Sequence, residues 1–345
     1  MSSTWSLSAI TAFRVCQRKY YFGHVLAKNH PSSPMIAKQA YWLKKAVNLE
    51  MWAGHVVDRI MTDKIVPAYK DGLDPDIQLT EAHALDLLNR QWHFSKDGSY
   101  RGTTESGSGD AYRVLDVHEN GSPFEKKDLE EVVRKVRESI RNVGQMKLAD
   151  GSSLVDLLKE ANWVSTDLNN RWTSIGDTSV GPQIDLMFWC RSSLHVIDWK
   201  VSEGKNSDYS RQLGVIGMVV YRARTKVYRE KAEAGEDTWM YDLEKRKIVL
   251  HEVNLLSGYA REHVFDKSTY GSHVDYVSKT SRDMEFFQKG RSWQDIPLNE
   301  YAFTESDYAC QSCSFRHLCN YLIENSHESF NPANYREFIR AAQLI

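Results

Sequence analysis

The stretch from Ile184 to Lys200, IDLMFWCRSSLHVIDWK, constrains the fold of this 345-residue chain more than any other. Two runs rich in β-branched and aromatic residues flank a polar turn at Arg191–Ser192, a pattern typical of a β-hairpin. Each run also carries an acidic residue, Asp185 in the first and Asp198 in the second. Residues at equal distances from the turn pair with each other when no bulge intervenes. The sequence therefore predicts that Asp185 and Asp198 face one another.

Two carboxylates placed in this way have Cβ atoms roughly 4.5–5.5 Å apart and repel each other. A hard divalent cation with oxygen ligands would remove the repulsion. Lys200, two residues after Asp198, points to the same face of its strand. Its ammonium could hold an attacking water or stabilise charge that develops on a phosphate. The alternative is that all three are ordinary solvent-facing strand residues.

The composition is that of a globular protein, with 41% hydrophobic and 26% charged residues. Because 44 basic residues balance 46 acidic ones, a nucleic-acid partner would need a local basic patch. No apolar run is long enough to span a membrane, and the N-terminus lacks the pattern of a secretory signal. We therefore expect a cytoplasmic protein that does not use a membrane. In that compartment thiols stay reduced, so the five cysteines suggest metal or cofactor ligation before disulfides.

Periodicity and punctuation predict helices, then a central β-meander, a helix, a hairpin and further helices. The expected helices cover residues 6–28, 41–66, 68–100, 128–143, 207–224, 257–291 and a last segment from about Asn331. The expected strands lie within residues 162–168, 171–176, 181–190 and 194–201, with a hairpin of 237–243 and 247–255. A Gly/Ser-rich stretch at 97–112 is expected to be a mobile loop. This order predicts an α/β fold with helical additions.

Several motifs together resemble the PD-(D/E)XK nuclease superfamily, and in particular its RecB-like and Cas4-like branch. They are Gly181 with Ile184-Asp185, the run Val196-Ile197-Asp198-Trp199-Lys200, and Gln212-Leu213 on the next predicted helix. The resemblance implies a restriction-endonuclease-like core, in which a mixed sheet is flanked by helices. It also implies that the acids bind Mg²⁺ or Mn²⁺, with the Trp199 carbonyl as a further ligand. Lys200 would then activate the water, and Gln212 would position the water or the DNA.

The same resemblance implies one more metal ligand, a histidine four residues after a glycine on an upstream helix. The sequence WAGHVVDRIM places Asp58 at that offset from Gly54, whereas His55 follows Gly54 directly. His55 and Asp58 share a helix face at this spacing. Residue type favours His55 and register favours Asp58, so both remain candidates. His55 could also be an ordinary residue of the polar face.

Four cysteines form a second motif. Cys310, Cys313 and Cys319 follow the spacing C-x2-C-x5-C, and Cys16 on the first helix can supply a fourth thiol. The arrangement resembles the iron–sulfur staple of Cas4 and AddB nucleases, which implies a [4Fe–4S] cluster that joins the N- and C-terminal segments. A structural zinc ion is the alternative, because four thiolates also bind zinc. Cys190, on the hairpin, is expected to be a buried strand residue.

These motifs divide the chain into four expected regions. They are an N-terminal helix with the first cluster cysteine (1–30), a helical region with the metal-binding helix at 50–62 (31–160), the nuclease core (161–255) and a helical region with the cysteine motif (256–345). Basic residues beside the motifs are candidate DNA contacts: Arg14, Arg18, Lys19 and Arg211. The aromatics Tyr20, Tyr21 and Phe22 could stack on bases or belong to the core.

The resemblance therefore implies a deoxyribonuclease, an exonuclease rather than an endonuclease, that acts on single-stranded DNA or DNA ends. By resemblance its role lies in DNA repair, CRISPR adaptation, phage replication or defence. An alternative is a nuclease-fold subunit or DNA-binding scaffold of a larger complex with a helicase or an integrase. A further alternative is a non-catalytic DNA-binding protein with a relic site. The unusual register at His55 and Asp58, and Ile216 where the family often has tyrosine, favour it, whereas the intact Asp185, Asp198 and Lys200 argue against it.

Overall fold

The computed structural model describes residues 3–166, 173–204, 208–242 and 245–325, together with positions 327 and 329. The expected last helix from about Asn331 lies outside these residues. The chain divides into two compact units. Unit 1 contains Met1–Trp5, Glu50–Leu88 and Glu125–Lys279, and unit 2 contains Ser6–Leu49, Asn89–Phe124 and Thr280–Ile345.

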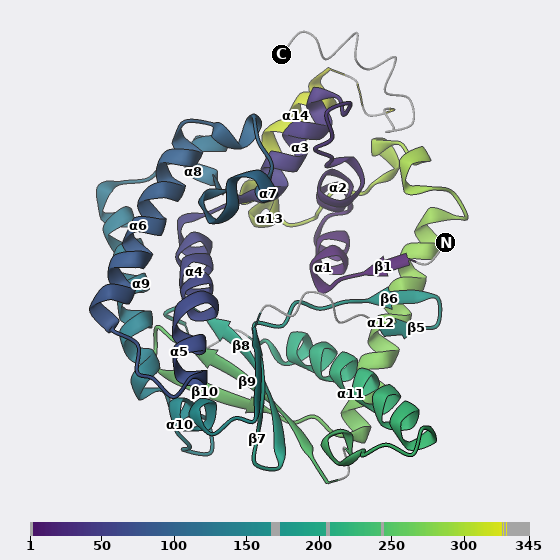
Figure 1. Cartoon of the computed structure of the whole chain (residues 1–345). Helices are drawn as coiled ribbons and strands as arrows, with labels where there is room; N and C mark the ends of the chain where they lie inside the picture. Colours follow the sequence, from purple (N-terminus) through teal and green to yellow (C-terminus); the bar gives the residue numbers. More distant parts are fainter. Residues whose placement is uncertain are drawn as a thin grey trace. The chain divides into compact units, whose positions relative to one another are not determined.

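Unit 1 is built around a five-stranded sheet with the strand order β10-β9-β8-β7-β4 (Figure 1). Its strands are β4 (Trp163–Thr166), β7 (Leu186–Cys190), β8 (Ser193–Lys200), β9 (Lys247–Asn254) and β10 (Tyr259–His263). β8 and β9 are parallel, and the other neighbours are antiparallel. The mixed sheet with helices confirms the predicted α/β architecture of the core.

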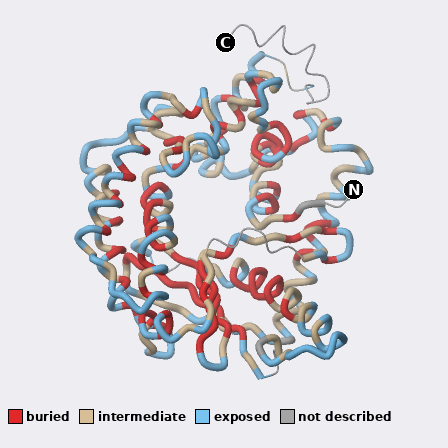
Figure 2. The backbone as a smooth tube through the Cα atoms, in the orientation of Figure 1, coloured by how far each residue is buried: buried red, intermediate tan, exposed pale blue. Residues whose placement is uncertain are grey.

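The hairpin of β7 and β8 has the predicted register. Leu186 pairs with Ile197 and Cys190 with Ser193, and Arg191 in the turn adopts a positive φ of 55°. One step beyond Leu186 and Ile197, the same register places Asp185 opposite Asp198. Both strands are buried along almost their whole length, as Figure 2 shows, and this includes Cys190 at 1% exposure.

Helix α11 (Ser210–Glu233) connects β8 to β9 and packs on one face of the sheet (Figure 1). A helix in this position is the usual crossover between two parallel strands. The core between helix and sheet includes Val196 of β8, Leu213 of α11 and Leu250 of β9. Gly214 lets α11 lie against a neighbour, since a Cβ there would come within 2.1 Å of the His273 ring. This packing brings the first turn of α11 to the end of β8 that carries the polar residues.

The remaining elements of unit 1 are a small sheet and several helices. The small sheet has the order β1-β6-β5, from β1 (Ser3–Trp5), β5 (Thr173–Ile175) and β6 (Thr178–Val180). The helices are α4 (Leu49–Ile60), the π-helical turn Met61–Ile65, α5 (Val66–Lys70), α9 (Lys126–Asn142), the 3-10 turns Val143–Gln145 and Trp239–Tyr241, and α10 (Leu154–Lys159). The long helices α6 (Ile77–Lys96) and α12 (Lys267–Gln288) belong partly to each unit.

Unit 2 is mainly helical and has an aromatic core. Its helices are α1 (Leu7–Val15), α2 (Gln17–Tyr20), the π-helical turn Tyr21–Leu26, α3 (Met35–Lys45), α7 (Glu105–Ser108), α8 (Asp116–Glu119), α13 (Asp307–Gln311) and α14 (Arg316–Glu324). Four 3-10 turns cover Ser99–Arg101, Gly109–Ala111, Trp293–Asp295 and Leu298–Glu300, and β2 (Ala46–Val47) pairs in parallel with β3 (Val114–Leu115). Ring contacts join N-terminal to C-terminal residues, for example Tyr21 with Tyr301 and Phe22 with Phe315.

Three predicted helices are interrupted. The one expected at 68–100 is divided into α5, which ends at Lys70, and α6, which begins at Ile77. The other two break nearer the N-terminus. The first stops at Cys16, whose extended backbone (φ −160°, ψ 113°) separates α1 from α2, although Ser6 caps α1 as expected by accepting from the Ala9 amide at 3.2 Å. The second breaks at Ala46–Val47, because these residues pair with β3 instead of continuing the helix. In both places a tertiary partner or a cap overrides a helical sequence pattern.

The predicted hairpin of residues 237–243 and 247–255 is wrong. Trp239–Tyr241 forms a 3-10 turn, and β9 pairs with β8 and β10. The expected helix at 257–291 is also wrong at its start, since Gly258 turns the chain with φ 64° and Tyr259–His263 forms β10. Short helical turns, including α7, occupy the 97–112 stretch. Within the part of the chain that the structure describes, no helix is long and apolar enough to cross a membrane.

Candidate active site

Asp198 and Lys200 occupy the end of β8 and point to the face that α11 covers. The Asp198 residue is 4% exposed, and the Lys200 side chain is 17% exposed. The Lys200 ammonium forms an ion pair with Asp198 Oδ2 and lies 4.2 Å from the centre of the Tyr209 ring. Burial raises the pKa of the Asp198 carboxyl, while the charge of Lys200 and its hydrogen bond oppose this rise. The predicted acid and base therefore meet in a site that largely excludes water.

Asp185 sits directly before β7 and contacts the backbone of the opposite strand. Its Oδ2 accepts a hydrogen bond from the Trp199 amide at 2.8 Å. Burial raises the pKa of Asp185 to about 8, and the charges of Asp198 and Asp58 contribute to the rise. The Trp199 hydrogen bond and the charge of Lys200 act in the opposite direction. The two aspartates of the hairpin thus influence each other, as the paired register predicts.

Helix α4 supplies the third acidic group. Asp58 acts electrostatically on Asp185, which places the two carboxyl groups in one neighbourhood. His55 lies one turn earlier on the same face of α4 and is half-buried, as Asp58 is. Asp58 is therefore one group that α4 presents to the site, and His55 shares its helix face.

Gln212 joins the site from the first turn of α11. Its Nε2 donates a hydrogen bond of 2.7 Å to Asp198 Oδ1. The amide therefore fixes the orientation of the Asp198 carboxyl from the side opposite to Lys200. The sequence predicted a role for Gln212, and the structure gives it this contact.

Glu252 is a further acidic residue of the site, and the sequence analysis missed it. It is 5% exposed and is the register partner of Asp198 on β9. His263 Nε2 donates to Glu252 Oε2 at 3.2 Å, and Arg261 Nη1 lies 3.8 Å from the same oxygen. The polar residues of HEVN in β9 were the available signal, but their use required knowing that β9 pairs with β8.

The acidic groups suit a divalent cation chemically, since carboxylate oxygens are the preferred ligands of Mg²⁺ and Mn²⁺. Burial chiefly raises the pKa of Asp185, and the charges of Asp198 and Asp58 add to the rise, so a bound cation would stabilise the ionised form of this carboxyl. Among the residues that the structure describes, however, no three His, Cys, Asp or Glu side chains converge closely enough to bind a metal ion. The donor set therefore fits, while the side chains would have to draw together around an ion.

The four motif cysteines gather within unit 2. The thiol of Cys313 interacts electrostatically with Cys16 and Cys310, and that of Cys319 interacts with Cys16 and Cys313. Burial raises the pKa of Cys313, and it raises the pKa of Cys319 to about 11. Thiols that are far apart in the sequence thus share one neighbourhood. Among the described residues, however, these thiols do not lie close enough together to bind a metal ion as they stand.

The predicted DNA contacts have different surroundings. Arg18 is 4% exposed: it donates from Nε to the Tyr301 carbonyl at 3.1 Å and hydrogen-bonds Cys319. Lys19 is half-buried, and its charge acts on Cys313. Arg14 is partly exposed and pairs with Asp283 at 3.2 Å. Arg18 therefore belongs to the thiol neighbourhood instead of a DNA surface, because a buried guanidinium cannot reach a phosphate.

The other candidates divide in the same way. Arg211 is exposed, and its guanidinium lies 4.6 Å from the centre of the Tyr276 ring. Tyr20, Tyr21 and Phe22 are at most 6% exposed and form part of the core of unit 2, so they do not offer stacking surfaces for bases. Arg14 of unit 2 and Arg211 of unit 1 are thus the exposed residues among these candidates.

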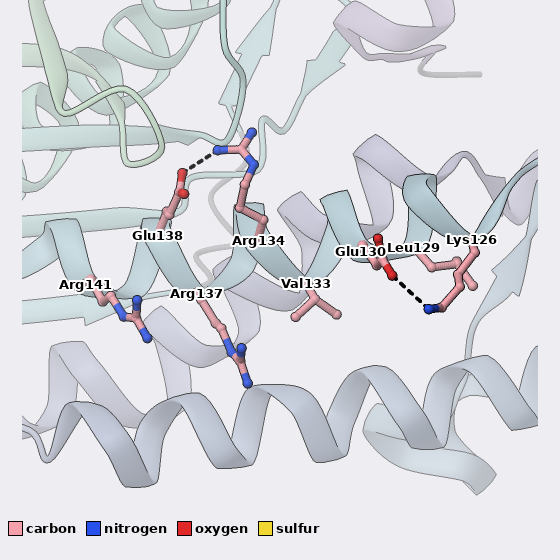
Figure 3. A pocket seen from close by; sticks show the side chains of 8 residues that line it. All are labelled: Lys126, Leu129, Glu130, Val133, Arg134, Arg137, Glu138 and Arg141. Atoms are coloured by element: carbon pink, nitrogen blue, oxygen red, sulfur yellow. Dashed lines mark hydrogen bonds and ion pairs between the residues drawn. The ribbon is translucent and has the colours of Figure 1, made fainter.

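A hollow of about 600 Å³ runs along α9 (Figure 3). Its lining is rich in charge: Lys126, Leu129, Glu130, Val133, Arg134, Arg137, Glu138 and Arg141. Arg134 pairs with Glu131, Glu138 and Glu203, and Arg141 pairs with Glu81. Because carboxylates balance these arginines, the hollow has no clear preference for an anionic ligand.

Comparison with known families agrees with this geometry. The family model described as PD-(D/E)XK nuclease superfamily matches residues 4–320. That span includes the hairpin, α4, α11 and the cysteine motif. No curated protein matches the chain.

Proposed function

The chain belongs to the PD-(D/E)XK nuclease superfamily, and on that premise we propose that it is a Cas4- or RecB-like deoxyribonuclease with two cofactors. The observation that carries the proposal is the buried group of Asp185, Asp198 and Lys200, which α11 completes with Gln212. Burying two carboxylates that repel each other lowers the stability of the fold. Their place in the core beside an ammonium therefore suggests that they have a catalytic role.

Nucleases of this superfamily typically use Mg²⁺ or Mn²⁺. Here the ligands would be Asp185, Asp198, the Trp199 carbonyl and either Asp58 or His55. The bound ion would polarise the scissile phosphate and lower the pKa of a water molecule. Gln212 holds the Asp198 carboxyl in place, and the Lys200 ammonium stabilises negative charge that develops on the phosphate oxygens.

The second proposed cofactor is a [4Fe–4S] cluster held by Cys16, Cys310, Cys313 and Cys319. The electrostatic interactions among the thiols support it, because they bring Cys16 into one neighbourhood with the three C-terminal cysteines. Arg18 hydrogen-bonds Cys319, and its positive charge would favour a deprotonated, metal-bound thiolate at that position. Four sulfur donors also suit zinc, which remains the alternative.

We further propose that the substrate is single-stranded DNA or a DNA end and that cleavage is exonucleolytic. The resemblance to Cas4 and RecB supports both points, as it supports a role in DNA repair, CRISPR adaptation, phage replication or defence. Reduced thiols available for a cluster fit a cytoplasmic location.

A second candidate function is a subunit or scaffold of a helicase–nuclease or DNA-integration complex with weak activity alone. One observation favours it: the described carboxylates of the site are not converged on a metal position. A partner or DNA could then be needed to draw them together.

Degradation of linear and circular single-stranded DNA by the purified chain tests the proposed function. With Mn²⁺ we expect the end-labelled linear strand to shorten and the circle to survive, because an exonuclease needs an end. Chelation with EDTA should stop the reaction. Cutting of the circle would show an endonuclease, and two intact substrates would favour the scaffold alternative.

A further inference from the structure

Three polar side chains form a straight row across the sheet beside the proposed active site. Asp198 of β8 pairs with Glu252 of β9, and Glu252 pairs in turn with Arg261 of β10. Paired residues of neighbouring strands point to the same face of a sheet. Arg261 therefore shares a face with Asp198 and lies two strands away, about 10 Å across the sheet.

Glu252 is the middle residue of this row and contacts basic side chains of β10. It is 5% exposed, and two basic side chains approach its Oε2 atom. His263 donates to that oxygen at 3.2 Å, and Arg261 Nη1 lies 3.8 Å from it. A buried carboxylate needs such partners, because its charge has lost the solvation of water. These contacts with Glu252 hold the side chains of His263 and Arg261 on the face of the sheet that carries Asp198.

Arg261 combines this anchoring with access to solvent. Its side chain is 34% exposed, and its Nε donates to the Tyr259 hydroxyl at 3.2 Å. Hydrogen bonds with Ser210 chiefly lower the pKa of Asp208, and the charges of His263 and Arg261 lower it further. Since Asp208 lies just before α11, the basic groups of β10 extend towards the helix that carries Gln212.

We propose that this face of β10 is a phosphate-binding site for the DNA strand, with Arg261 as the contacting residue. The inference rests on the proposed nuclease function and adds to it the place where a phosphate next to the scissile one is held. A guanidinium suits this task, because it is always charged and presents several donors to phosphate oxygens. Glu252 and His263 act as positioning residues that keep the Arg261 side chain in line with Asp198.

Salt-dependent DNA binding by the full-length chain tests the proposal. We would measure the affinity for a labelled single-stranded oligonucleotide in EDTA, where a metal-dependent nuclease does not cut, from about 50 to 200 mM salt. Each phosphate contact contributes about 0.7 to the slope of log affinity against log salt for a single strand. We expect Arg261→Gln to lower the slope by about that amount and to weaken binding several-fold.

Two further variants separate a local contact from a change of net charge or of folding. Arg229→Gln removes the same charge from an exposed position on α11, about 25 Å along the helix from Gln212, and should leave the slope unchanged. Arg261→Lys keeps the charge and should retain the slope.

The binding measurements test the β10 phosphate site separately from the proposed nuclease function. Equal slopes for Arg261→Gln and Arg229→Gln would overturn the β10 site while DNA binding by the wild type stands. If Arg261→Lys also had a lower slope of log affinity against log salt and was unfolded, Arg261 would have a structural role instead. A wild-type chain that binds no DNA would overturn the function as well.

Discussion

Replacing Lys200 with alanine is expected to lower the rate of DNA cleavage by about 100- to 1,000-fold, the usual effect of removing one preorganised charge-stabilising group. The Lys200 ammonium pairs with buried Asp198 and is largely shielded from water, so its charge acts strongly on a phosphate in the same site. Cleavage of end-labelled single-stranded DNA in Mn²⁺ measures the effect, and DNA binding should persist.

Lys226→Ala is the matched control, because Lys226 lies on α11 with a side chain that is 77% exposed. It should cut at the wild-type rate. Equal rates for Lys200→Ala and Lys226→Ala would remove Lys200 from the chemistry.

Replacing Cys16 with serine is expected to have the largest effect on stability. Cys16 would join a sulfur-bound cofactor to Cys310, Cys313 and Cys319, closing a loop that covers most of the chain. Loss of such a cross-link costs about 3–5 kcal/mol in the chain-entropy model and should lower the Tm by about 10 °C. Thermal unfolding of anaerobically purified protein, with iron and zinc content measured on the same sample, tests this.

Cys190→Ala provides the comparison within the same chain. Cys190 is buried in β7 of unit 1, so this variant removes a thiol without removing a proposed ligand. It should keep the metal content of the wild type. If Cys16→Ser also kept that content and its Tm, the four-thiol cofactor would be contradicted, whether cluster or zinc. Detection of iron together with sulfide in the wild type would identify an iron–sulfur cluster, and detection of zinc alone would identify a zinc site.

The hairpin could be predicted because its information is local. The turn at Arg191–Ser192 fixes the pairing of β7 with β8, and the strand alternation then places Asp185, Asp198 and Lys200. The partner of β8 on its other side could not be predicted in this way. β9 follows after α11 and pairs in parallel, so neither a turn nor a spacing identifies its register.

Without that register, the sequence could not identify the polar groups that lie next to Asp198. Glu252 lies between His251 and Val253 in a strand without a regular polar pattern, and only its pairing with Asp198 indicates that it belongs to the site. Arg261 and His263 were hidden further, since the sequence around them was interpreted as helix. The pairing of β9 and β10 with their neighbouring strands therefore determined the secondary structure here, although the local sequence favoured a different one.

The break at Cys16 illustrates a different case, in which a proposed metal-binding cysteine lies at the point where the predicted helix ends. The cysteine spacing predicted the thiol neighbourhood, and the electrostatic interactions among the four thiols agree with it. The amphipathic pattern through Cys16 gave no sign of the extended residue that divides α1 from α2. Burial of Arg18 was also beyond the pattern, since basic residues are almost never buried without a partner.

Titration of Mn²⁺ into the wild type and into Asp185→Asn by calorimetry tests whether the paired carboxylates bind a metal ion. We expect a binding event in the wild type that Asp185→Asn loses. Burial raises the pKa of Asp185 to about 8, so protons compete with the metal below that value, and wild-type binding should strengthen as the pH rises from 6.5 to 8.5. Equal binding by both proteins, at a strength independent of pH, would contradict a metal site at the paired carboxylates.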